Sequence, residues 1–251
     1  MLTRKQQRKY LAKKDEEWQT QLHAFAETRN REALHHLRVA VKKLKAFARL
    51  SEACSCSRAV RDLNVLKKMF RQAGAIRDAD NRLRLLEHFH AAPEAYRNEQ
   101  RQFSEHETSA FVGNMEEYRK KGKKAGRRLQ VEVRSIRAGC IKDWYAKQLI
   151  KIGVLLTASG DRLHQARKHI KDLLYVGSAL PPQLAQEIGL NTKYLDRLQE
   201  TIGQWHDAAM VVASWAGKDL AGSQAMIREC RDKEEAVRRL ANDFYLHAHI
   251  R

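Results

Sequence analysis

The stretch LHHLRVAVKKLKAFARL, from Leu34 to Leu50, decides the fold of this chain. A related stretch, LHQARKHIKDLLYVGSAL, begins at Leu163, 129 positions later. When the two are overlaid at this offset without a gap, a histidine, an arginine and a lysine coincide. The coinciding pairs are His35 with His164, Arg38 with Arg167, and Lys42 with Lys171.

The shared register extends beyond these two stretches. At the same offset Gly74 coincides with Gly203, and Asp78 with Asp207. Two unrelated helices would not keep register over about fifty residues, so the chain is two copies of one helical unit. We place the copies at about 10–125 and 129–251. Because such repeats bury apolar faces against their neighbours, we expect a single domain over 1–251 in which the copies pack together.

The composition is that of an all-α protein. Apolar residues make up 43% of the 251 residues, and 3 prolines and 12 glycines leave few breaks in a helical periodicity. Each copy supplies roughly four helices, which predicts two four-helix bundles about a pseudo-twofold axis. Asn30 is expected to cap a helix, and a kink is expected near Gly74. The expected helices span 15–27, 31–50, 58–89, 94–118, 129–156, 162–180, 192–215 and 223–247.

The net charge points to anionic partners. The chain has 48 Lys and Arg against 30 Asp and Glu, a formal charge of +18, which favours polyanions or anionic membranes. No apolar run reaches the ~18–20 residues of a spanning helix, and the basic N-terminus lacks the apolar region of a secretory signal. The four cysteines (Cys54, Cys56, Cys140 and Cys230) lack CxxC spacing. We therefore expect reduced thiols in a cytoplasmic protein, with disulfide and zinc roles as less favoured alternatives.

One face of the first signature helix is cationic and the opposite face is apolar. At about 100° per residue, five polar side chains fall within about 80° of one another. They are His35, Arg38, Lys42, Lys45 and Arg49. An ordinary solvated face mixes acids with bases, yet the helix from Ala33 to Leu50 has no Asp or Glu. Stacked like charges cost stability unless an anion offsets them, so the pattern favours an anion-binding face over a merely solvated one.

These motifs resemble those of the CHAD family, the conserved histidine α-helical domain. HHLRVAVKKLK from His35 is similar to its first signature, GAIRDAD from Gly74 to its G-x-x-R-D-x-D element, and LQETIG from Leu198, with Asp207, to a later element. The resemblance covers nearly the whole chain. It implies a pseudo-twofold helical fold that binds inorganic polyphosphate in a basic central channel, without known catalysis.

The resemblance also implies which residues bind polyphosphate. In copy one they are His35, Arg38, Lys42, Lys43 and Lys45, and in copy two His164, Arg167 and Lys171. We add Arg49 and Tyr175, which share the cationic faces, and Lys168, a cation where the family has an apolar residue. Asp172 and Leu174 stand where the family tends to have basic residues, so we expect copy one to contribute more. The histidines could instead be structural residues that orient their helices.

The acids and the remaining motifs leave alternatives open. Asp78 and Asp207 are expected to pair with signature Arg or Lys side chains, with a symmetric metal site as the less favoured reading. His206-Asp207 is superficially similar to the pair of metal phosphohydrolases. No phosphate loop or nucleophile–base pair is evident, so we expect no catalytic residue, no metal and no cofactor. The basic segment Arg119–Arg128 reads equally well as binding surface or as solvated loop.

Three functions follow from these observations. The leading one is non-enzymatic binding of inorganic polyphosphate by a cytoplasmic protein, with polyphosphate granules as a location. The first alternative is a nucleic-acid-binding protein, since a strongly basic chain holds DNA or RNA non-specifically at low salt. Against it, no helix-turn-helix spacing or aromatic RNA-binding motif is present. The second alternative is a metal-dependent phosphohydrolase.

Overall fold

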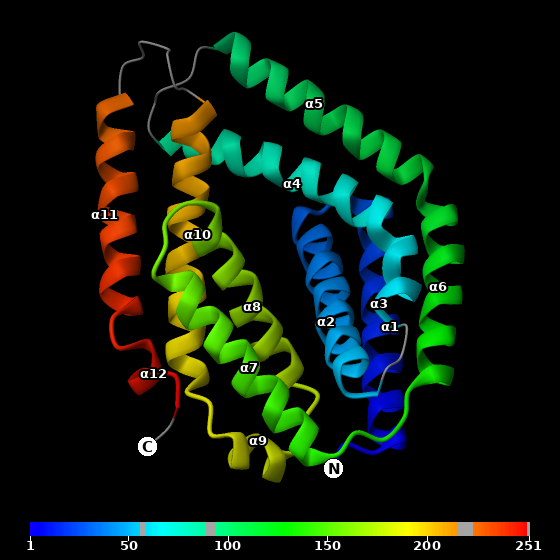
Figure 1. Ribbon diagram of the computed structural model, residues 1–251. Helices are drawn as coiled ribbons and strands as arrows, with labels where there is room; N and C mark the ends of the chain where they lie inside the picture. Colours follow the sequence, from blue (N-terminus) through cyan, green and yellow to red (C-terminus); the bar gives the residue numbers. More distant parts are fainter. Residues whose placement is uncertain (56–58, 89–93, 215–222, 250–251) are drawn as a thin grey trace.

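A computed structural model describes residues 1–55, 59–88, 94–214 and 223–249 of the chain (Figure 1). This part is helical apart from turns and two isolated β-bridges, so the all-α prediction is confirmed. The elements are α1 (Arg4–Thr28), α2 (Arg31–Ser55), α3 (Ala59–Asp62), the 3-10 turn η1 (Leu63–Leu66), α4 (Lys67–His88), α5 (Glu94–Gly113), α6 (Met115–Glu132), α7 (Ala138–Leu156), α8 (Asp161–Gly177), α9 (Pro182–Ile188), α10 (Thr192–Ser214), α11 (Ser223–Ala241) and α12 (Phe244–His247).

The order of the elements repeats along the chain. Helices α1, α2, α4 and α5 correspond to α7, α8, α10 and α11, and α5 and α11 begin 129 positions apart, at Glu94 and Ser223. The two copies meet where α2 packs against α8 and where α4 approaches α10 (Figure 1). The copies differ at their ends, because α6 has 18 residues and its counterpart α12 has 4.

One apolar core runs through both copies. It includes Leu37, Val41 and Leu44 of α2 together with Ile170 and Leu173 of α8. These side chains lie opposite the cationic residues of the two signature helices, as the periodicity predicts. The core therefore fixes the rotation of α2 and α8 about their axes and turns both cationic faces toward the junction of the two copies.

Several helix boundaries differ from the sequence prediction. The first helix begins at Arg4, well before residue 15, because Thr3 and Gln6 form a capping box. Asn30 caps α2 as expected, with its side chain accepting from the amide of Glu32. The helix is not interrupted at Gly74: α4 runs unbroken through that residue, and the break in the chain's helical run is the 3-10 turn η1.

The segment Arg119–Arg128 lies inside helix α6, so its reading as a loop is wrong. α6 continues to Glu132, and α7 begins only at Ala138, where one long helix from residue 129 was expected. The break is held by Leu2, which exchanges two backbone hydrogen bonds of 2.9 Å with Ile136. The start of the chain thereby fixes the boundary between the two copies.

The cysteines correct another expectation. Cys54 of α2 and Cys140 of α7 form a disulfide, with their Cα atoms 5.8 Å apart, so the prediction of reduced thiols is wrong for this pair. The residues are 86 positions apart, and only the packing of α2 beside α7 brings them together. Cys230 is a free thiol, and Cys56 lies outside the described residues. None of the described helices is long and apolar enough to cross a membrane.

Candidate polyanion-binding pocket

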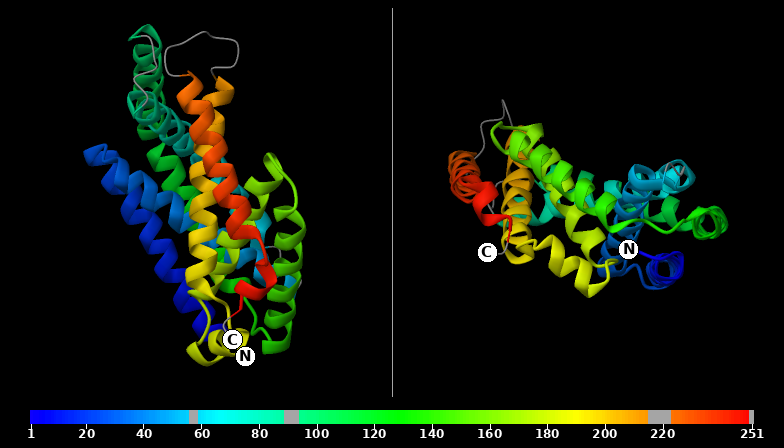
Figure 2. Two further views of the ribbon diagram at one scale, coloured as in Figure 1. Left: turned by 90° about the vertical axis from the view of Figure 1, so that its left-hand side faces the viewer. Right: turned by 60° about the horizontal axis from the view of Figure 1, so that its bottom comes forward.

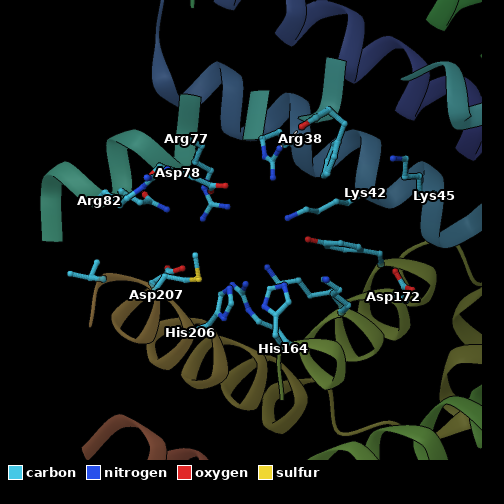
Figure 3. Close-up of a pocket in the computed structure, with 18 of the residues that line it drawn as sticks. Arg38, Lys42, Lys45, Arg77, Asp78, Arg82, His164, Asp172, His206 and Asp207 are labelled. Carbon is cyan, nitrogen blue, oxygen red and sulfur yellow. Dashed lines mark hydrogen bonds between the residues drawn. The ribbon is translucent and has the colours of Figure 1, made fainter. Parts of the chain in front are cut away.

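A cavity of about 450 Å³ lies where the two copies meet. Its walls come from α2 and α4 of the first copy and from α8 and α10 of the second, and the labelled side chains point into the space between them (Figure 3). Nine Lys and Arg side chains line it against three Asp. The cations are Arg38, Lys42, Lys45, Arg49, Arg77, Arg82, Arg167, Lys168 and Lys171.

Arg38 is held in place by its own copy. Its guanidinium donates to the carbonyl oxygen of Phe70 at 2.6 Å and lies 4.2 Å from the centre of the Phe70 ring. One turn further along α4, a Cβ atom on Gly74 would come within 2.8 Å of the same guanidinium. The missing side chain at residue 74 therefore provides the space in which Arg38 lies against the backbone of α4.

The second copy repeats this arrangement. Arg167 donates from Nε to the carbonyl oxygen of Gln199 at 3.0 Å, and a Cβ atom on Gly203 would come within 2.5 Å of its guanidinium. The carbonyl lies 32 positions after the arginine in both copies. The coincidence of Arg and Gly in the sequence repeat thus has a physical cause: each arginine lies over a glycine of the facing helix.

Burial and neighbouring cations disfavour the charged forms of Lys42 and Lys171. Burial lowers the pKa of Lys42 to about 7, helped by the charges of Arg38, Lys171 and Arg77. Burial likewise lowers the pKa of Lys171 to about 8, with Arg167 and Arg77 adding to the effect. Both ammonium groups are disfavoured in the free pocket because they lose water and face other cations. An anion that entered the pocket would restore their charge.

The histidines of the two copies have different surroundings. His164 stacks on His206 with ring centroids 3.9 Å apart, and burial, together with the charge of His206, lowers its pKa to about 4. In the first copy the residue matched to His206 is Arg77. Burial and then the charge of Arg77 lower the pKa of His35, although His35 does not line the cavity.

The three acids of the pocket play different roles. Asp172 is buried and accepts from Arg49 at 2.5 and 2.7 Å, which joins α8 to α2 across the two copies. Burial raises the pKa of Asp172, and Arg49 opposes this. Asp78 and Asp207 act on Arg38 and Arg167 through their charges. Within the described part of the chain neither forms an ion pair within 4 Å, so direct pairing is not seen.

Most of the predicted binding residues come together. Nine of the eleven line the cavity, namely Arg38, Lys42, Lys45, Arg49, His164, Arg167, Lys168, Lys171 and Tyr175. His35 lies on the exposed surface of α2. Lys43 turns toward α1, where burial and the charge of Lys14 lower its pKa. Of the nine, Arg49 is already engaged by Asp172.

Sequence reasoning missed the contribution of α4 and α10. Arg77, Arg82 and Asn81 of α4 line the cavity, and so do Phe70 and, from α10, His206, Met210 and Val211. A signal was available, because Arg77 lies within the GAIRDAD motif beside Asp78. Applying the 129-residue offset to that position leads directly to His206, next to Asp207.

The lining can hold a chain of negative charges. Arg38 Nε and His164 Nδ1 are buried and have no hydrogen-bond partner among the described residues. Arg and Lys side chains form short, charge-assisted hydrogen bonds to anionic oxygens, and bare cations in a cavity leave this capacity unused. In the described ranges, no group of three or more His, Cys, Asp or Glu side chains is placed to hold a metal ion.

Comparisons with known proteins agree with this fold. The crystal structure of the CHAD domain from the plant Ricinus communis matches with a TM-score of 0.67 at 16% identity, over 98% of this chain and 86% of that chain. This likeness shows the fold alone. A comparison with curated proteins finds no significant match. The family model of the CHAD domain, however, matches residues 9–214, which is most of the chain. The chain therefore belongs to the CHAD domain family.

Proposed function

We propose that the protein binds inorganic polyphosphate in the pocket between its two copies, without catalysis. The observation that carries this proposal is the convergence of nine Lys and Arg side chains from both copies on one cavity. A linear chain of phosphates presents oxygen acceptors along its length, so one chain can contact cations of α2, α4 and α8. Such contacts offset the loss of water and the neighbouring charges that lower the pKa values of Lys42 and Lys171.

The chemistry of the lining favours binding over turnover. Its side chains donate hydrogen bonds and supply positive charge, while no Ser, Thr or Cys nucleophile is among the described residues that line the cavity. The arginines that lie over Gly74 and Gly203 are fixed before any ligand arrives, which lowers the entropic cost of binding. Polyphosphate granules of the cytoplasm are the location that we propose, although a disulfide such as Cys54–Cys140 is rare in that compartment.

The test compares ligands of equal charge and different shape. Long-chain polyphosphate should bind at physiological salt more tightly than single-stranded DNA of equal total charge, because its phosphates fit more closely among the pocket cations. The same samples should release no phosphate from polyphosphate or nucleotides, with or without divalent metal. Reproducible metal-dependent release that vanishes in Asp207→Asn would support the phosphohydrolase instead.

A further inference from the structure

A second basic surface lies away from the pocket, on the outer side of the first copy. Helices α1 and α6 pack side by side at one edge of the molecule, opposite the edge formed by α11 (Figures 1 and 2). The small residues Gly122 and Gly126 of α6 lie against Trp18 and Asp15 of α1 and leave no room for a Cβ atom. The two helices are therefore in close contact, and their solvent faces form one continuous surface.

Exposed cations from both helices gather there, and we call them the outer basic surface. Of the seven basic residues in Arg119–Arg128, only Arg119 and Lys121 form ion pairs within the described residues. Lys123 and Arg127 lie near α1, because their charges act on Asp15. The members of the outer basic surface are Lys5, Arg8 and Lys9 of α1, and Lys120, Lys123, Lys124 and Arg127 of α6, all exposed.

Few acids offset these charges. Asp15, between the helices, accepts from the side chains of Trp18 and Gln19 at 2.8 and 3.0 Å. The exposed acids of these helices include Glu16 of α1 and Glu116 and Glu117 of α6, and the last two pair with Arg119 and Lys121. Arg8 donates to the carbonyl oxygen of Gln130 at 2.8 Å, which fixes it near the end of α6 without cancelling its charge. The α1–α6 packing thus holds like charges together.

We propose that the outer basic surface binds the phosphate backbone of duplex nucleic acid. The pocket of about 450 Å³ between four helices cannot admit a base-paired duplex, whose grooves alone are about 6 and 12 Å wide. The outer surface lies at the edge of the molecule and its cations are exposed, and cations four residues apart on one helix repeat about every 6 Å along it. A duplex carries one negative charge per ~1.7 Å of axis and presents several phosphates at once.

The rigidity of a duplex distinguishes it from the other polyanions. A flexible chain lying on an exposed surface would lose conformational freedom for each phosphate that it places, whereas a duplex holds its phosphates already ordered. A membrane-inserting helix needs an exposed apolar face, but the apolar side of α1, with Leu11, Trp18 and Leu22, is buried in the core. The observations therefore favour a duplex over a free chain or over insertion into a membrane.

The test is a triple charge reversal with a matched control. Lys9→Glu, Lys120→Glu and Lys124→Glu alter the outer basic surface without touching Asp15 or the core. The control, Lys147→Glu, Lys151→Glu and Lys193→Glu, makes the same change in net charge at exposed lysines of α7 and α10. Binding of a fluorescent 20-base-pair DNA duplex and of long-chain polyphosphate would be measured by anisotropy, with helix content checked by circular dichroism.

The outer triple variant should lose at least about tenfold in duplex affinity and show a shallower dependence on salt, by roughly one unit per lost phosphate contact. The polyphosphate affinity of the outer triple variant should change much less. The duplex affinity of the control triple variant should fall by less than about threefold. Equal losses in both triple variants would mean that net charge alone attracts DNA and would overturn the proposal. So would a wild-type protein that binds anionic lipid vesicles but no duplex.

Discussion

The two copies contribute matching helices to one pocket, but they do not contribute matching charges. The first copy supplies six Lys or Arg side chains to the lining and the second supplies three. Where α4 has Arg77 and Arg82, the matched positions of α10 have His206 and Val211. Both copies have an arginine that lies over a glycine of the facing helix, and each copy contributes one of the two facing lysines, Lys42 and Lys171. These parts are present in both walls, while the other charges of the two walls differ.

The largest expected effect comes from reversing one of the facing lysines. Lys42→Glu and Lys171→Glu should each weaken polyphosphate binding by at least about tenfold, because a charge-assisted contact is worth ~1.5–3 kcal/mol and repulsion is added. Lys42→Glu should be the more damaging, since it alters the wall that holds more cations. Affinities measured by calorimetry, with short and long chains, would check this.

The matched control is Lys147→Glu, at an exposed residue of α7, which should lose little polyphosphate affinity. A long chain that spans both copies should sense both pocket changes, whereas a short one can settle in the unaltered half. If Lys171→Glu proved as harmful as Lys42→Glu, the asymmetry of the walls would have no consequence for binding.

A smaller effect is expected from pH. In the free pocket the pKa of Lys42 is about 7 and that of Lys171 about 8, both below the ordinary lysine value. A bound polyanion favours the charged form and raises both values, so binding takes up protons, and affinity falls as pH rises through about 7 to 9. We expect polyphosphate affinity to fall about tenfold between pH 6.5 and 9. The proton uptake on binding would be measured by calorimetry in buffers of different ionisation enthalpy.

Arginine substitutions sharpen this test, because they keep the charge at every pH used. Lys42→Arg and Lys171→Arg together should flatten the pH dependence and abolish most of the proton uptake. An affinity that falls equally with pH in this double variant would assign the titration to groups other than these two lysines.

The smallest effect should come from the feature that the copies share. Gly74→Ala and Gly203→Ala each place a methyl group where a guanidinium lies, and the arginine must leave its backbone carbonyl. We expect a loss of about two- to fivefold in polyphosphate affinity with little change in thermal stability, since the displaced groups are the ends of flexible side chains. Similar losses in the two variants would confirm that the shared geometry serves both walls.

The periodicity of single helices predicted much of the site. It predicted the cationic faces of α2 and α8, because the apolar face of each helix packs in the core and the cationic face on the opposite side stays outside it. It could not give the helices across the cavity, and so it omitted Arg82 and Met210, whose positions depend on how α4 and α10 cross the signature helices. Lys43 was misplaced because α1 takes the side of α2 on which it lies.

Contacts between residues far apart in the sequence could not be predicted from spacing. The Cys54–Cys140 disulfide joins residues 86 positions apart, and no spacing rule foresees it. The basic segment Arg119–Arg128, for which a loop was one of two interpretations, is part of α6. In the structure its residues Gly122 and Gly126 allow α1 to approach, and only the packing of the two helices shows this.

The Arg49–Asp172 contact means that the protein carries its own anion at one end of the cavity. A phosphate that binds Arg49 must displace the carboxylate of Asp172, a residue that is 8% exposed. This displacement is unfavourable, because a buried charge that loses its partner is destabilising. Binding there is an exchange of one anion for another, with little net gain. The two ends of the cavity are therefore unequal, and an incoming chain gains most at the end lined by Arg77 and Arg82, far from this internal competitor.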